Sequence, residues 1–259
     1  MFPNPIIEVN LFGINISVHW FGVWVAIGIL CAFTVLFQYT KKKQVDSRFV
    51  DFIFYNGIAS IMVGFVSAAL FQAVYNYIEH PELGFRFGEG ITFIGGLIGG
   101  VLCFLIVYVI FSKKYEAKLS AVISILPCSI LIAHAFGRIG CFFAGCCYGI
   151  ETDSIFGITF PYLSHAVFPT QLYEAIFLLL IFGICSYLVM KKNYQDNMSL
   201  YLFTYGIFRF LIEFIRGDDR GEFLGGIVSP SQFWSLAMII VAVLLYIISR
   251  RKNKNEDGQ

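Results

Sequence analysis

The stretch His134-Ala-Phe-Gly137-Arg138-Ile-Gly140-Cys141-Phe-Phe-Ala-Gly145-Cys146-Cys147-Tyr148-Gly149 ends a long apolar run. It contains four glycines, three cysteines and a single arginine. Glycine lets a backbone approach a ligand closely, and a cation near hydrocarbon is costly and usually marks function. The stretch therefore predicts a membrane helix that leads into a phosphate-binding segment.

The composition indicates a membrane protein. Of the 259 residues, 58% are hydrophobic and 14% are charged, the mean hydropathy is +0.76, and a bilayer core needs about 20 apolar residues per helix. We expect an all-α polytopic membrane protein, a bundle of about seven transmembrane helices in a single domain over residues 1–259. No basic residue precedes the first run, and no small-residue cleavage site follows it, so we expect a retained helix. The seven runs are 17–39, 51–78, 91–111, 119–136, 170–190, 199–215 and 231–249.

The distribution of basic residues predicts the orientation. Thirteen of the eighteen fall in alternate loops and in the C-terminal tail. Because cytoplasmic loops carry an excess of Lys and Arg, we expect the N-terminus outside, the C-terminus in the cytoplasm, and outer loops at 79–90, 137–169 and 216–230. The five remaining arginines then belong to the outer half: Arg86, Arg138, Arg209, Arg216 and Arg220.

The sixth run carries a polar stripe. Tyr205, Arg209, Glu213 and Arg216 recur at helical spacing, so we expect them on one helix face. On an apolar membrane helix such a face should point into the bundle and serve function rather than packing. Arginine binds phosphate oxygens bidentately, so Arg138 and Arg209, on the same side of the bilayer, predict a site for a phospholipid headgroup.

Glycines and one proline suggest further features. Gly137 and Gly140 would let Arg138 and nearby backbone N–H groups approach a phosphate. Gly95 and Gly96 lie in a run of small residues spaced for close helix packing. Pro127 is expected to kink its helix.

The three clustered cysteines leave several interpretations open. Cys141, Cys146 and Cys147 lie on the predicted outer face, where packing or a disulfide, a reactive thiol, or metal binding are the alternatives. The C-x4-C-C spacing matches no recognised zinc pattern, so neither a metal nor a cofactor is expected. A thiol redox protein is a further hypothesis, although the chain has no C-x-x-C pair.

Two histidines are candidate general bases. His134 precedes Arg138 by one helical turn, and His19 lies at the same predicted membrane face. We interpret His80 and His165 as ordinary loop residues.

Taken in order, these motifs resemble those of the prolipoprotein diacylglyceryl transferase family, of which the chain resembles a divergent member. The resemblance covers most of the chain. The matching pieces are His19-Trp20, Phe93 to Gly99, Gly137-Arg138-Ile139-Gly140 through Gly149, Pro169-Thr170-Gln171-Leu172-Tyr173-Glu174, Tyr205 to Phe210 with Glu213-Phe214, and Ser229 to Gln232.

The resemblance implies a seven-helix enzyme of the bacterial inner membrane. Such an enzyme transfers a diacylglyceryl group from phosphatidylglycerol to the lipobox cysteine of a prolipoprotein, whose signal peptide is then a partner; no nucleic acid is expected. It implies that Arg138 and Arg209 stabilise the leaving phosphate, that Tyr205 donates a hydrogen bond to it, and that Glu213 orients Arg209. The expected substrate-binding positions are Gly95, Gly96, Gly137, Gly140, Gln171, Tyr173, Glu174 and Glu213.

The chain departs from the family pattern at several polar positions. Ile94 stands where the family usually has histidine, and Phe21 where it has tyrosine. Cys141 and Cys146 replace an asparagine and a glutamate, and Phe168 replaces a histidine. Either His134 or His19 has taken over the role of base, or the protein acts on another lipid or acceptor. A non-catalytic membrane protein that binds anionic lipid or exports a small solute is the remaining alternative.

Overall fold

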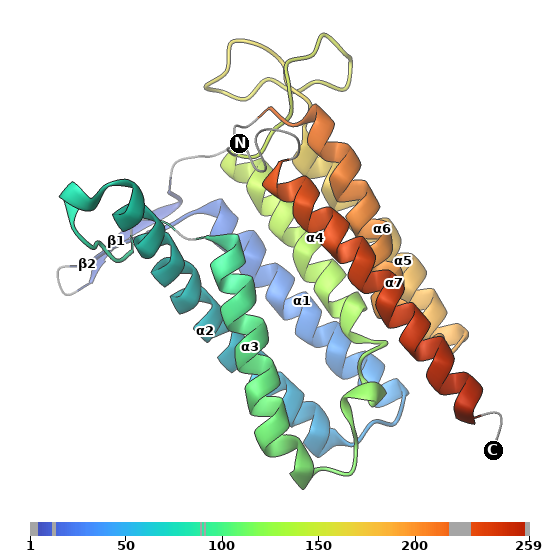
Figure 1. Cartoon of the computed structure of the whole chain (residues 1–259). Helices are drawn as coiled ribbons and strands as arrows, with labels where there is room; N and C mark the ends of the chain where they lie inside the picture. The colour runs from blue at the N-terminus through green and yellow to red at the C-terminus, as the bar shows by residue number, and fades with distance from the viewer. Residues whose placement is uncertain (1–4, 12–13, 89, 91, 218–228, 257–259) are drawn as a thin grey trace. The chain divides into compact units, whose positions relative to one another are not determined.

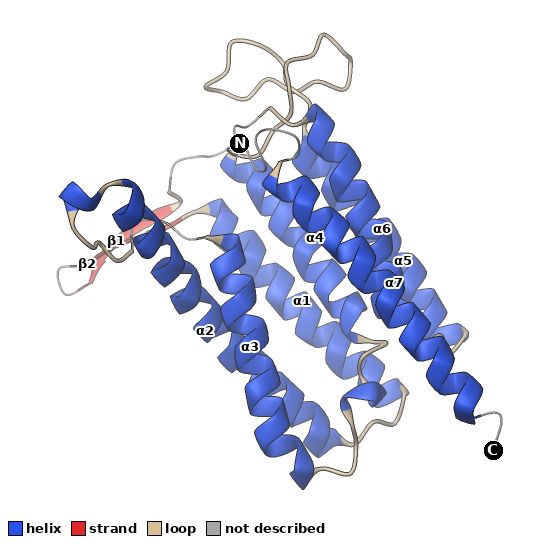
Figure 2. Ribbon diagram, viewed as in Figure 1, coloured by secondary structure: helices blue, strands red, loops and turns tan. Residues whose placement is uncertain are grey.

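The computed structural model describes residues 5–11, 14–88, 90, 92–217 and 229–256. Seven helices within these ranges are long and apolar enough to cross a membrane. Figures 1 and 2 show how the helices of each unit are arranged. The predicted all-α polytopic membrane fold is confirmed, whereas the orientation of the termini stays a prediction. The helices are α1 (Trp20–Lys42), α2 (Ser47–Glu79), α3 (Phe93–Phe111), α4 (Leu126–Ala144), α5 (Thr170–Lys191), α6 (Asn197–Ile212) and α7 (Pro230–Glu256).

A β-hairpin that the apolar pattern did not predict precedes α1. Strands β1 (Ile7–Leu11) and β2 (Ile14–Val18) pair antiparallel, with Ile7 opposite Val18. The hairpin ends at Val18, two residues before α1 begins at Trp20.

Contacts divide the chain into two compact units. Unit 1 comprises Met1–Tyr39 and Val122–Gln259, and unit 2 comprises Thr40–Ala121. Unit 1 thus holds most of α1 together with α4 to α7, and unit 2 holds α2 and α3. The single domain over residues 1–259 stays a prediction.

Helix α4 lies further along the chain than its apolar run predicted. It begins at Leu126, which places Pro127 in the first turn, where proline is well tolerated; the predicted mid-helix kink is wrong. The helix continues to Ala144 and ends at Gly145, whose φ of +74° gives a left-handed cap. The outer loop predicted over 137–169 therefore starts at 145, because Gly137 and Gly140 are helical. The predicted outer loop at 216–230 falls mostly on residues 218–228, which lie outside the described residues.

Glycine makes the α2–α3 contact of unit 2 close. A Cβ on Gly95 would lie 2.5 Å from the Phe71 Cβ, and one on Gly96 would lie 3.3 Å from the Gly64 carbonyl oxygen. The Ser67 hydroxyl donates to the Gly95 carbonyl at 2.8 Å. Gly95 and Gly96 thus act as packing residues in this unit, and their predicted role in substrate binding stays a prediction.

We expect Gly95→Ala to lower the stability of the protein, because the added methyl group overlaps the Phe71 side chain. Overpacking of this kind costs about 1–3 kcal/mol. Thermal unfolding in detergent micelles measures the effect. Gly183→Ala in α5 is the control, since a Cβ there meets nothing within 4 Å; equal unfolding temperatures for the two variants would contradict the packing role.

In unit 1, buried polar and aromatic contacts hold α4, α5 and α6 together. The fully buried Asn197 amide donates to the carbonyls of Ser124 and Cys185, both at 3.0 Å. Phe177 of α5 stacks on Phe208 of α6 with ring centroids 4.0 Å apart. These contacts fix the three helices that carry the polar residues of the site.

Helix α6 ends before the last residue of the predicted polar stripe. After Ile212 the chain forms a 3₁₀ turn over Glu213–Ile215, and Arg216 is extended and bridges Gly149. Tyr205, Arg209 and Glu213 follow the predicted spacing, but the prediction that Arg216 shares their helix face is wrong. Pairing with the segment after α4 replaces the next helical turn.

Candidate active site

A buried carboxylate joins three helices at one end of unit 1. The ends of α4 and α6 and the starts of α5 and α7 lie together there (Figure 1). Glu174, in the second turn of α5, is 0% exposed. Its Oε1 lies 3.0 Å from the Arg138 Nε and accepts a hydrogen bond of 2.6 Å from the Tyr205 hydroxyl. One carboxylate oxygen therefore ties α4 and α6 to α5.

His134 belongs to the same cluster. Its Nε2 lies 3.5 Å from the Tyr205 hydroxyl and 3.7 Å from Glu174 Oε1, and its ring meets the Tyr205 ring edge-on. The position of His134 one turn before Arg138 on α4 explains why both face Glu174. The predicted role of His134 as base stays a prediction, and its Nε2 faces this network.

The cluster of Glu174, Arg138, Tyr205 and His134 contains an oxygen atom that can still accept a hydrogen bond. Among the described residues, Glu174 Oε2 is buried without a hydrogen-bond partner. An unsatisfied buried polar atom costs about 1–3 kcal/mol, and such atoms need explaining in a native structure. This oxygen is suited to accept a hydrogen bond from a bound hydroxyl or from water.

Arg209 forms a second ion pair one turn along α6. Its Nη1 lies 2.6 Å from Glu213 Oε2, and its Nη2 donates to the Ser231 hydroxyl at 2.8 Å. Ser229 donates to the other Glu213 oxygen at 2.7 Å, so the carboxylate is held from both sides. This geometry supports the prediction that Glu213 orients Arg209. Because Tyr205 and Arg209 are four residues apart, the two clusters are neighbours on α6.

The remaining predicted site residues lie outside these clusters. His19 is exposed immediately before α1. Tyr173 donates to the Phe156 carbonyl at 3.3 Å. A Cβ on Gly137 would meet nothing within 4 Å, whereas one on Gly140 would lie 3.2 Å from atoms of Phe21 and Trp24. Gly137 thus has open space beside it, and Gly140 packs against α1.

Gln171, the last of these residues, contacts the segment that carries the cysteines. Its side-chain amide donates to the Cys146 carbonyl at 2.5 Å, and the neighbouring Thr170 hydroxyl donates to the Cys147 carbonyl at 2.8 Å. Both side chains are buried. The start of α5 therefore supports the cysteine segment as well as Glu174.

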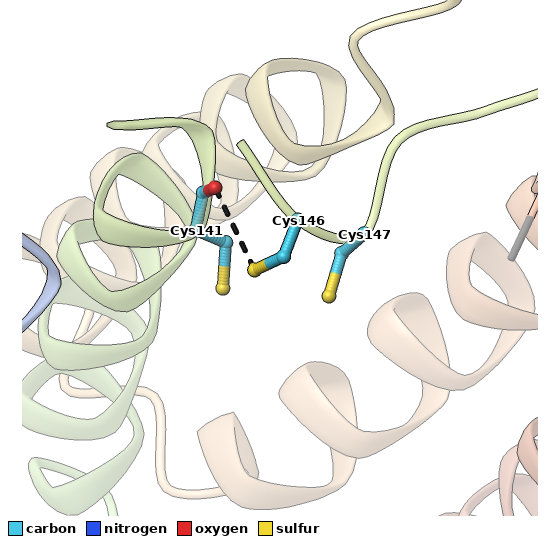
Figure 3. A group of neighbouring side chains, drawn as sticks. All are labelled: Cys141, Cys146 and Cys147. Atoms are coloured by element: carbon cyan, nitrogen blue, oxygen red, sulfur yellow. Dashed lines mark hydrogen bonds between the residues drawn. The ribbon is translucent and has the colours of Figure 1, made fainter. Parts of the chain in front are cut away.

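The sulfur atoms of Cys141, Cys146 and Cys147 gather at the end of α4 (Figure 3). They lie within 4.8 Å of one another, and all seven cysteines of the chain are thiols. Hydrogen bonds from the Cys141 and Cys146 thiols, together with the positive charge of Arg216, lower the pKa of the Cys147 thiol. The sequence placed these three cysteines together on one predicted face and left their role open. Gly145, whose φ is +74°, ends α4 and lets the chain turn back toward Cys141.

Fold and site together define a polytopic membrane protein with two arginine–carboxylate pairs, each with at least one buried partner, at one end of unit 1. Residues 9–248 match the family described as prolipoprotein diacylglyceryl transferase. The chain belongs to this family.

Full-length relatives carry the corresponding name. The chain is 35% identical over 250 residues to a phosphatidylglycerol–prolipoprotein diacylglyceryl transferase of Clostridium tetani (strain Massachusetts / E88), covering 93% of this chain and 96% of the relative. It is 33% identical to phosphatidylglycerol–prolipoprotein diacylglyceryl transferase 2 of Clostridium perfringens (strain 13 / Type A), covering 96% and 97%. The similarity thus spans all seven helices.

Proposed function

We propose that this protein transfers a diacylglyceryl group from phosphatidylglycerol to the cysteine thiol of a prolipoprotein lipobox. The observation that carries the proposal is the pair formed by the half-buried Arg138 and the buried Arg209, held at one end of unit 1 by Glu174 and Glu213. Family membership supports the reaction. We further propose a multi-pass location in the bacterial inner membrane with this end of unit 1 outside, because Lys191, Arg250 and Arg251 lie near the opposite ends of α5 and α7.

The two arginines suit different tasks. Arg138 contacts Glu174 through Nε, so the two Nη groups of its guanidinium supply the fork that binds phosphate oxygens. Arg209 directs Nη1 to Glu213 and Nη2 to Ser231. We assign the main contact with the leaving phosphate to Arg138 and a supporting positive charge to Arg209. Donors fixed before the reaction stabilise charge that develops as the C–O bond breaks.

Glu174 and Tyr205 position Arg138 and recognise the headgroup. The Tyr205 hydroxyl directs its proton to Glu174, so its part in the proposed site is to hold the carboxylate rather than to donate to phosphate. Glu174 Oε2 would accept a hydrogen bond from a glycerol hydroxyl of phosphatidylglycerol. Such a bond distinguishes this donor lipid from one without headgroup hydroxyls.

The test is transfer of labelled diacylglyceryl from phosphatidylglycerol micelles to a lipobox peptide by the purified protein. A peptide with serine in place of the acceptor cysteine should receive no label, and phosphatidylethanolamine should not serve as donor. A folded protein that binds phosphatidylglycerol but transfers nothing would identify a non-catalytic lipid-binding member instead.

We expect Arg209→Gln to reduce the transfer rate about ten- to hundredfold, because a charged hydrogen bond is worth about 1.5–3 kcal/mol. Initial rates in the same assay measure this. Arg251→Gln, at an exposed position near the other end of α7, serves as control and should retain full activity. If Arg209→Gln transferred lipid as fast as the control, Arg209 would have no role in the reaction.

A further inference from the structure

The three thiols after Arg138 have the arrangement of a metal-binding group. The Sγ atoms of Cys141, Cys146 and Cys147 all lie within 4.8 Å of one another and on the same side of the segment (Figure 3). Zinc–sulfur bonds of about 2.3 Å in tetrahedral geometry place two sulfurs about 3.8 Å apart. Small side-chain rotations would bring all three sulfur atoms within bonding distance of one zinc ion.

The backbone of this segment is held in place independently of any ion. Cys147 has a φ of +66°, a left-handed conformation that costs a residue with a Cβ about 1–2 kcal/mol. The buried Thr170 and Gln171 side chains hold the carbonyls of Cys147 and Cys146, and the Cys146 N–H donates to the Cys141 carbonyl at 3.2 Å. A strained residue fixed by buried partners is typical of a functional site.

The surrounding charges favour a metal with three thiolates. One Zn²⁺ with three thiolates carries a net charge of −1. The Arg216 guanidinium lies against Cys147, and Arg138 is three residues before Cys141 on the same helix face. The positive charge of Arg216 therefore offsets the charge of the loaded site, which lowers the cost of placing it beside the membrane.

We propose that Cys141, Cys146 and Cys147 bind Zn²⁺ through three thiolates and that the fourth coordination position takes the acceptor thiol. Within the described residues, the group of potential ligands consists of these three side chains. Zinc sites with three protein ligands and one exchangeable position are catalytic sites, whereas structural sites use four protein ligands. Thiolate ligands also select thiophilic metals over Mg²⁺ or Ca²⁺.

This inference rests on the proposed transferase function and supplies the step that activates its acceptor. The lipobox thiol replaces zinc-bound hydroxide, which takes the thiol proton and leaves as water, because a coordinating thiol is deprotonated. The sulfur electron pair then forms the C–S bond to the glyceryl carbon. The C–O bond to phosphate breaks, and the leaving glycerol phosphate keeps its electron pair beside Arg138. No oxidant or reductant is required.

The first experiment measures metal binding without reference to activity. Purified full-length protein in detergent with a phosphine reductant is titrated with Co²⁺, whose visible absorption reports tetrahedral thiolate coordination. We expect one Co²⁺ per chain, displaced by Zn²⁺, and an affinity at least tenfold weaker in Cys146→Ser. Cys103→Ser, a half-buried cysteine of α3, is the matched control and should bind as the parent does. Zn²⁺ should also protect the exposed Cys146 of the parent protein from maleimide.

The second experiment examines the fourth position. Adding a lipobox peptide should change the Co²⁺ absorption, whereas the same peptide with serine for cysteine should leave it unchanged. No thiolate–Co²⁺ absorption in the reduced parent, or absorption unchanged in Cys146→Ser, would overturn the site. Full transfer activity in zinc-free protein would overturn its role while leaving the transferase assignment intact. Normal metal binding and peptide response without lipid transfer would support the site and contradict the proposed function.

Discussion

Replacing Arg138 with glutamine should lower the rate of diacylglyceryl transfer by about 10²- to 10³-fold. This is the usual cost of removing one preorganised donor to a developing negative charge. We expect so large a loss of rate because the Arg138 side chain is only 17% exposed and contacts its carboxylate partner, Glu174, through Nε. The Nη fork is then the part of the guanidinium that remains to hold phosphate. Initial rates in the lipobox peptide assay measure the loss.

The single substitution also leaves Glu174 buried without its cation, so misfolding must be separated from lost chemistry. The double variant Arg138→Gln/Glu174→Gln removes both charges, and at position 174 it also keeps the shape of the side chain. We expect it to unfold at a higher temperature than Arg138→Gln alone and to remain equally inactive. If the double variant regained activity, Arg138 would be a structural partner of Glu174 and not a phosphate ligand.

The second large effect concerns stability. Glu174→Ala should lower the free energy of unfolding by about 3–5 kcal/mol, because breaking a buried ion pair leaves an uncompensated charge. The Arg138 guanidinium would lose its carboxylate, and the Tyr205 hydroxyl would lose the acceptor of its 2.6 Å hydrogen bond. Unfolding titrations in mixed micelles, with tryptophan fluorescence as the signal, measure the change.

An exposed ion pair provides the matched control. Glu151 lies 3.0 Å from His165, and its side chain is 70% exposed. Exposed pairs contribute about 0–1 kcal/mol, so Glu151→Ala should barely change the unfolding curve. Similar curves for the Glu151 and Glu174 variants would show that the buried network does not hold α4, α5 and α6 together.

The proposed metal site gives a common explanation for the departures that the sequence resemblance implies. The resemblance described from the sequence implies that Ile94 takes the place of a histidine and that Cys141 and Cys146 take the places of an asparagine and a glutamate. A thiolate-bound metal would deprotonate the acceptor without a protein base. The alternative that His134 serves as base is tested by His134→Gln, which should then lose activity whether or not zinc is present.

The sequence by itself determined the seven helices and predicted both arginines of the proposed site. In a chain this hydrophobic, apolar runs of about 20 residues form membrane helices, because a helix satisfies all its backbone hydrogen bonds within the bilayer. The spacing of Tyr205, Arg209 and Glu213 placed them on one face because helical periodicity is local. Helix ends were less predictable: α4 begins and ends later than its apolar run, since Pro127 fits a first turn and Gly145 forms the cap.

Only the tertiary structure decided which groups meet. That Arg138 pairs with Glu174 and Arg209 with Glu213, and that Gln171 and Thr170 hold the cysteine carbonyls, depends on how α4, α5, α6 and α7 pack. The Cys141, Cys146 and Cys147 spacing matches no zinc pattern, yet the left-handed turns at Gly145 and Cys147 gather the three sulfurs. Contacts between distant residues and reversals of chain direction leave no periodic signal in a sequence. The packing of the helices therefore determined which of these groups come together.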